Sequence, residues 1–229
     1  MEAVTFDQMA DKVERDLDLE DEVFITRTEL LGYANEGIHE AEATILRICE
    51  DYFLDQESLT LVSGQADYTP PAGFFADKIR EIVYAYGTRV YPVRRMRYQS
   101  SFQQIAREGI NPTTGGDYRY LMINNATSGR KIRLYPTPAE AGARMTIWGI
   151  RSAKKLAVDS DVVDIPEFHS YIEQFMKMRC YEKEGHPNLG TAVRMLEALK
   201  QSMIETLSNR FPDNDDLIEG DFSFYEEHS

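Results

Sequence analysis

The sequence predicts an α+β fold, in which helices from both ends of the chain form a bundle and an antiparallel β domain is inserted between them. Near both ends, apolar residues recur every three or four positions, which is the period of an amphipathic helix. In the middle they alternate with polar residues, which is the period of a half-buried strand. With 229 residues, 42% of them hydrophobic, the chain is long enough to bury a core.

Two amphipathic helices are expected in the first quarter of the chain. One covers residues 6–17. A capping box begins the other, because the Thr26 hydroxyl can accept a backbone N–H while the Glu29 side chain reaches back to the Thr26 N–H. The two apolar stripes are Phe6, Met9, Val13 and Leu17, and then Leu31, Ala34, Ile38, Ala41, Ile45, Ile48 and Tyr52.

The middle of the chain is predicted to hold short strands joined by turns. Gly87-Thr88 has the composition of a hairpin turn between two alternating runs. Several short strands with regularly spaced turns are typical of a β-sandwich or a small barrel. The strands are expected within 58–63, 80–86, 90–94, 118–123, 131–135 and 144–151, and a short helix within 99–108.

Two further helices are predicted near the C-terminal end. Pro166 suits the first turn of one helix, and Gly185-His186-Pro187 ends it. Asn188 is expected to cap the last helix. The apolar stripes are Phe168, Ile172, Phe175 and Met176, and then Leu189, Val193, Leu196, Leu199, Met203 and Leu207.

The last nineteen residues form an acidic segment with no period. They contain seven acids and no base, together with apolar anchors. A segment too charged to fold alone but carrying such anchors is typical of one that orders on a partner; the alternative is a frayed end packed on its own domain. The anchors are Leu217, Ile218, Phe222, Phe224 and Tyr225. The predicted organisation is a helical bundle domain of 1–56 and 156–210, an inserted β-rich domain of 57–155, and an extended acidic tail of 211–229.

The net charge of −14 is unevenly distributed along the chain. Residues 1–22 carry nine acids and two bases, whereas residues 78–155 carry fifteen bases and four acids. The basic stretch is compatible with phosphate binding, with an acidic partner surface that includes the ends of another copy, or with a solvated face. The acidic total opposes free binding to duplex DNA, because like charges slow the encounter.

No pattern in the sequence is typical of a catalytic, metal or cofactor site, so we expect no enzyme activity and no cofactor. Phosphate-binding glycine loops and the nucleophile elbow are absent, and the four histidines are scattered. Cys49 and Cys180 are expected to be buried free thiols. No apolar run approaches the roughly 18 residues of a membrane span. The acidic start, Met1-Glu2-Ala3-Val4, does not resemble a secretory signal, so we expect a protein that stays in the cytoplasm or in a particle assembled there.

The chain resembles the head-to-tail adaptor (connector) proteins of tailed bacteriophages, the group that includes podovirus tail tubular protein A. Together the similar stretches span about residues 27–186, although the family's Leu-Pro pair after Tyr68 is replaced by Thr69-Pro70-Pro71-Ala72. These stretches are RTELLGYANE at 27–36, LTLVSGQADY at 59–68, KIRLYPTP at 131–138 and DVVDIPEFH at 161–169.

The resemblance implies a structural protein of the virion, assembled in the bacterial cytoplasm. It implies a homo-oligomeric ring, typically of twelve copies, that docks under the portal protein, extends the DNA channel without specific binding and carries the distal tail or nozzle protein. On this reading the acidic tail contacts the portal. Loops 86–91, 109–117 and 124–130 would face the tail side, with Gly87, Arg89, Pro112, Gly115, Asn125 and Arg130 as candidate contact residues.

Two other function classes stay open at this point. A peptidoglycan hydrolase associated with the tail would need paired carboxylates in a cleft, and with 39 acids no particular pair stands out. A nucleic-acid-binding module would use the basic stretch and its aromatic residues. The tyrosines concerned, which also alternate as ordinary sheet residues do, are Tyr84, Tyr86, Tyr118 and Tyr120.

Overall fold

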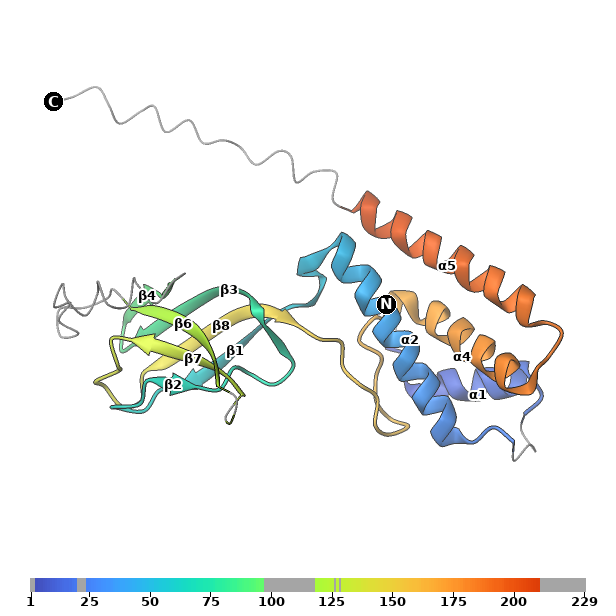
Figure 1. Cartoon of the computed structure of the whole chain (residues 1–229), viewed down its shortest axis with the longest axis horizontal. Coiled ribbons are helices and arrows are strands. Elements are labelled where there is room, and N and C mark those ends of the chain that lie inside the picture. The colour runs from blue at the N-terminus through green and yellow to red at the C-terminus, as the bar shows by residue number, and fades with distance from the viewer. Residues whose placement is uncertain (1–2, 20–23, 97–117, 126, 128, 211–229) are drawn as a thin grey trace, which may run out of the picture. The chain divides into compact units, whose positions relative to one another are not determined.

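The computed structural model describes residues 3–19, 24–96, 118–125, 127 and 129–210. The chain splits into two compact units (Figure 1). One comprises Met1–Cys49 with Lys155–Ser229 and is called the helical unit; the other comprises Glu50–Lys154 and is called the β unit. The predicted α+β class is confirmed. The short helix expected within 99–108 lies outside the described residues.

In its described residues the helical unit has four α-helices. They are α1 (Phe6–Asp16), α2 (Arg27–Ile48), α4 (His169–Glu184), preceded by the 3₁₀ turn η3 (Pro166–Phe168), and α5 (Leu189–Asn209). The predicted capping box at Thr26 and Glu29 is confirmed, and Thr5 with Gln8 forms a second one on α1. Gly185 ends α4 in the left-handed conformation. The expected capping by Asn188 is wrong: its backbone is helical and its side chain makes no capping bond, although it is the N-cap residue of α5.

The apolar stripes of the helices meet in one core. In α2 the stripe begins at Leu30 rather than Leu31, and the helix ends at Ile48, after which Glu50–Phe53 form the 3₁₀ turn η1. Only four of the 21 residues of α5 are buried, so this helix packs by a narrow face. The fully buried residues include Phe6, Met9, Leu30, Ala34, Ile45, Ile172, Met176 and Leu207.

Ion pairs between helices reinforce this core. Arg27 of α2 reaches the carboxylates of Asp7, Asp11 and Glu14, all on α1. Lys12 of α1 binds Glu173, a carboxylate of α4 that is almost completely buried. Further pairs between helices are Lys177–Asp16, Arg179–Glu36, Lys183–Glu29 and Lys200–Glu40.

A side-chain clamp holds the segment that returns from the β unit. The Asn35 amide accepts a hydrogen bond from the Leu156 N–H at 2.9 Å and donates one to the Leu156 carbonyl at 3.0 Å. Five residues after Leu156, the Asp161 carboxylate accepts hydrogen bonds from the N–H groups of Ala157 and Val158. The backbone around Asp161 then bonds to the start of α1.

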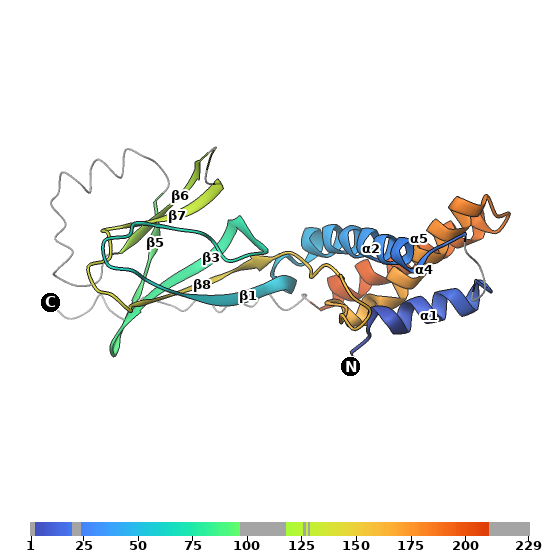
Figure 2. The ribbon, with the colours of Figure 1, turned by 90° about the horizontal axis from the view of Figure 1, so that it is seen from below.

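The described strands of the β unit form two four-stranded sheets, in the orders β1-β8-β3-β4 and β2-β7-β6-β5 (Figure 2). The chain switches sheets at Val93, whose N–H bonds to β3 while the next N–H bonds to Tyr118, just before β6. The expected all-antiparallel arrangement is wrong at one place, because β5 runs parallel to β6. The strands are β1 (Leu54–Thr60), β2 (Asp67–Tyr68), β3 (Phe74–Tyr86), β4 (Arg89–Pro92), β5 (Arg94–Arg95), β6 (Arg119–Asn125), β7 (Gly129–Tyr135) and β8 (Arg144–Arg151).

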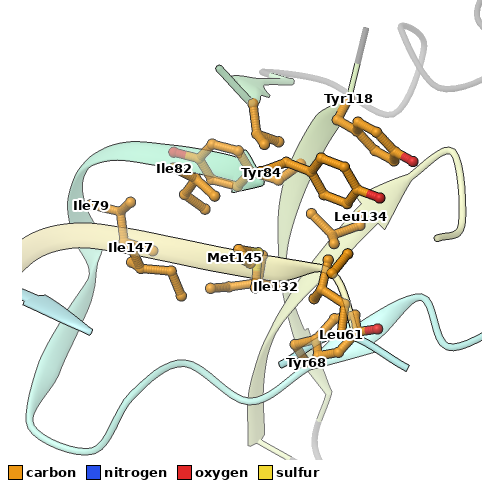
Figure 3. Close-up of a cluster of buried hydrophobic side chains, with 13 residues drawn as sticks. Leu61, Tyr68, Ile79, Ile82, Tyr84, Tyr118, Ile132, Leu134, Met145 and Ile147 are labelled. Atoms are coloured by element: carbon orange, nitrogen blue, oxygen red, sulfur yellow. The ribbon is translucent and has the colours of Figure 1, made fainter. Parts of the chain in front are cut away.

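The two sheets contribute to a single hydrophobic cluster (Figure 3). Ile147 and Met145 of β8 face Ile132 and Leu134 of β7 in it, and all four are at most 1% exposed. Tyr84 and Tyr118 stack with their ring centroids 4.1 Å apart. The Tyr84 hydroxyl donates to the Glu140 carboxylate at 2.9 Å, and burial raises the pKa of this tyrosine.

Candidate interaction surfaces

Several predicted contact residues lie outside the described part of the chain. They are Pro112 and Gly115 of the loop 109–117, and the tail residues Leu217, Ile218, Phe222, Phe224 and Tyr225. The candidates that the structure places are Gly87, Arg89, Arg130 and the backbone of Asn125.

Gly87 and Arg89 lie at the turn between β3 and β4, where the predicted hairpin is confirmed. Gly87 has a φ of 59°, a conformation that glycine adopts without a steric penalty. Beside the turn, Tyr86 is 47% exposed and Val90 is 65% exposed. The tip therefore presents an aromatic ring, an aliphatic side chain and a guanidinium to solvent.

Arg130 and Asn125 lie at the other end of the β unit. Asn125 pairs with Gly129 at the turn between β6 and β7, and Arg130 lies 3.7 Å from the carboxylate of Asp77, near the start of β3. Tyr86 ends β3 nine residues later, about 30 Å away at roughly 3.3 Å per residue. Figures 1 and 2 show the two turns at opposite ends of the sheets. The structure thus does not bring Gly87 and Arg89 together with Arg130.

Both connections to the helical unit leave from one end of the β unit. Leu54 of β1 pairs with Ile150 of β8, close to where the chain passes into and out of the unit. At the other end of the same strands, Arg144 pairs with Ala85, one residue before the β3–β4 turn. The β3–β4 turn is therefore the distal tip of the unit, and the β6–β7 turn lies at the connected end.

Seven of the described arginines of the β unit fall into two groups. Arg133, Arg80 and Arg151 each bind a carboxylate, with Arg133 held in a double hydrogen bond to Asp67 at 2.6 and 2.7 Å. That bond lowers the pKa of Asp67. By contrast, Arg89, Arg94, Arg95 and Arg144 are exposed and bind no carboxylate in the described part of the chain. These four are called the unpaired arginines.

A small cleft brings one unpaired arginine together with Arg130. Its volume is about 160 Å³. The polar residues that line it are Asp77, Arg95, Asn124 and Arg130, and the apolar ones are Ala76, Met122 and Ile123. The distance of 3.7 Å between Arg130 and Asp77 is too long for a hydrogen bond, so neither guanidinium in the cleft is saturated by a carboxylate. This set of residues is called the arginine cleft.

The helical unit presents a groove of about 430 Å³ beside α5. Leu17, Tyr181 and Met195 contribute apolar surface to it, and Met195 is 54% exposed. Lys177 also lines the groove, but it is paired with Asp16 of α1. The groove therefore offers apolar surface without a free charge to select a partner.

Groups associated with catalysis do not converge in the described residues. No three His, Cys, Asp or Glu side chains among them are placed to hold a metal ion. Cys49 and Cys180 are buried, as predicted, and form no disulfide bond, and burial raises the pKa of Cys180 to about 12. None of the helices described is long and apolar enough to cross a membrane.

The tyrosines considered for base stacking are mostly core residues. Tyr84, Tyr118 and Tyr120 are at most 5% exposed, and only Tyr86 reaches solvent. A stacking platform for single-stranded nucleic acid needs a row of exposed rings, so these residues do not form one. Their alternation in the sequence marked the inner face of the sheets.

Comparison with known proteins identifies one family. The model of the family described as SU10 adaptor protein matches residues 4–216. The match covers the whole β unit and nearly all of the described helical unit. A search of curated proteins finds no match to the sequence.

Proposed function

Because this chain belongs to the SU10 adaptor protein family, we propose that it is a structural adaptor at the head-to-tail junction of a tailed bacteriophage. In this proposal copies of the chain form a ring, typically of twelve, under the portal. The ring extends the DNA channel and carries the distal tail protein. The observation that carries the proposal is the extent of the family match, which includes both units.

The distribution of exposed groups supports a binding role rather than a catalytic one. The described residues offer exposed apolar side chains beside charges, at the distal tip of the β unit and along α5. Tyr86 and Val90, next to Arg89, form the kind of mixed patch that protein interfaces use at their centre. We therefore assign the distal tip, with Gly87 and Arg89, to the tail-side partner.

We assign the portal-side contact to the segment 211–229. Its acids and aromatic residues suit a segment that orders on a folded partner, with Phe222, Phe224 and Tyr225 as anchors. The β6–β7 turn is not included in the tail-side surface of this proposal, because it lies at the opposite end of the β unit from the distal tip.

The test is assembly of the phage with and without the protein. Phage lacking the chain should yield heads that contain the portal but carry no tail, and addition of the purified chain should restore tail attachment. A chain ending at Arg210 should fail to bind such heads, whereas an Arg89→Gln chain should bind heads but recruit the tail protein poorly. Tailed particles formed without the protein, or clearing of bacterial cell wall by the pure chain, would contradict the proposal.

A further inference from the structure

We propose that the arginine cleft of one copy binds the acidic C-terminal segment, 211–229, of a second copy. This inference goes beyond the proposed function, because it concerns the protein before the portal is available to that segment. It gives the segment a first binding site on the protein itself, which portal docking would then replace.

The charges of the cleft define its ligand. Arg95 binds no carboxylate among the described residues, and Arg130 has only Asp77, at 3.7 Å. Guanidinium groups bind carboxylates through charge-assisted hydrogen bonds, as Arg133 does with Asp67 in the same sheet. A carboxylate from another chain can therefore satisfy Arg95 and Arg130 together, with the Asn124 side chain as a further polar group at the cleft.

The segment 211–229 has the complementary composition. It carries seven acids and no base, so every charged side chain in it is attracted to the cleft. Phe222, Phe224 and Tyr225 stand between Asp221 and Glu226. Aromatic rings beside carboxylates match a cleft in which Met122, Ile123 and Ala76 adjoin two guanidiniums.

The length of the segment allows it to reach a neighbouring copy. It follows directly on α5, which ends at Asn209, and an extended chain of nineteen residues spans at most about 65 Å. Its own unit is strongly acidic, with 29 acids and 11 bases, whereas the β unit has 10 acids and 14 bases. Electrostatic attraction therefore directs the segment to a β unit rather than back onto the helices.

An acidic peptide suits the cleft better than nucleic acid does. The Asp77 carboxylate, whose side chain is 71% exposed, repels both kinds of anion, so the size of the cleft decides between them. A cleft of about 160 Å³ admits a side chain or two but offers no track for a strand.

The test uses a labelled synthetic peptide of residues 211–229 and the full-length chain, with binding followed by fluorescence anisotropy. We expect Arg95→Gln and Arg130→Gln each to weaken binding by about tenfold or more, since each removes a charge-assisted hydrogen bond. Arg144→Gln is the matched control, because it removes the same charge from an exposed, unpaired arginine at the distal end. It should change the affinity by less than about twofold, as expected of a distant surface charge.

A second pair of variants tests the sign of the effect. Asp77→Asn should tighten peptide binding several-fold, because it removes a carboxylate that competes for Arg130. Glu81→Gln makes the same charge change on an exposed residue of β3 that does not line the cleft, and it should leave the affinity nearly unchanged. A gain caused only by overall charge would appear in both variants.

Self-association of the full-length chain tests whether the segment of one copy binds the cleft of another. At low salt, sedimentation should show dimers or larger species that increase with protein concentration and disappear in the Arg95→Gln, Arg130→Gln double variant. In the peptide experiment, the proposal is overturned if a scrambled peptide binds equally well or if Arg144→Gln weakens binding as much as Arg95→Gln. It is also overturned if an oligonucleotide binds the cleft more tightly than the peptide does. In the sedimentation experiment, it is overturned if the full-length chain stays monomeric. Those outcomes would leave the adaptor function itself standing, because none of these measurements involves the portal.

Discussion

The helical unit and the β unit use their charged side chains in different ways. In the helical unit, basic side chains on α1, α2, α4 and α5 bind carboxylates of another helix, as Arg27 does with three acids of α1. In the β unit four exposed arginines bind no carboxylate among the described residues, so its small positive excess lies on the surface. Ion pairs therefore link the helices of the first unit, whereas several arginines of the second are left available to partners.

The largest effect is expected from the apolar core of the helical unit. Phe6 is fully buried on α1, and Phe6→Ala should lower the free energy of unfolding by about 3–5 kcal/mol, because it removes a buried ring and leaves a cavity. Helical circular dichroism should report the loss. Near-ultraviolet signals from Trp148, in the β unit, should melt at an unchanged temperature; a shift of both signals by the same amount would show that the two units unfold as one.

A smaller effect is expected from packing in the β unit. A Cβ atom at Gly149 would lie 2.9 Å from a ring carbon of Phe74, so Gly149→Ala should destabilise the β unit by about 1–3 kcal/mol. Gly32→Ala is the control in the helical unit, since nothing lies within 4 Å of its Cβ position. It should stabilise α2 by about 0.5–1 kcal/mol. Denaturant unfolding curves that move in the same direction for both variants would contradict this view of the packing.

Ionic strength should distinguish the two units further. Arg27 binds three acids of α1, yet those carboxylates are partly exposed, so Arg27→Ala should cost only about 1 kcal/mol. The cost should shrink at high salt, where such pairs are screened. The corresponding change at an unpaired arginine, Arg89→Ala, should leave stability unaltered at every salt concentration; a salt-dependent loss there would mean that the arginine has a partner within the chain.

The smallest effect is expected from pH. A hydrogen bond from Lys183, with one from the Thr26 backbone, lowers the pKa of Glu29 from its usual value to about 2. A carboxylate whose pKa is lower in the folded state contributes stability that is present above its unfolded pKa. That contribution is lost as the pH falls from about 4.5 to about 2. Glu29→Gln should therefore flatten the acid limb of the unfolding curve in this window, and an unchanged acid limb would exclude the contribution.

Strands with one buried face were predicted from the sequence, whereas strand segments without a regular buried face were missed. The strand 144–151 was predicted to the residue, because the buried Met145 and Ile147 alternate with less buried neighbours. Strand β1, in contrast, begins at Leu54 rather than near residue 58, because as an edge strand it leaves most of its side chains exposed. The start of β3 was missed for another reason: shifts in its register against β8 disturb the period of two.

The candidate surfaces were predicted only in part. Hairpin turns such as Gly87-Thr88 have a local signature, so the distal tip was expected from the sequence. That Arg95 and Arg130 line one cleft was not, because they are 35 positions apart and belong to different strands. The sequence also could not show that Arg95 lacks a carboxylate partner. That follows only from the structure, in which Asp67, Asp55 and Glu50 form ion pairs with other basic residues.

The pairing of Leu54 with Ile150 has a consequence for how the inserted β unit can be exchanged. Residues directly opposite on antiparallel strands have Cα atoms about 5 Å apart, so the β unit begins and ends at almost the same point. An insertion whose two ends nearly touch leaves the host helices free to fold around the junction. We therefore expect that β units can be exchanged between homologous proteins at this junction. The inserted unit needs only two adjacent strand ends at the junction, whatever its structure further along the strands.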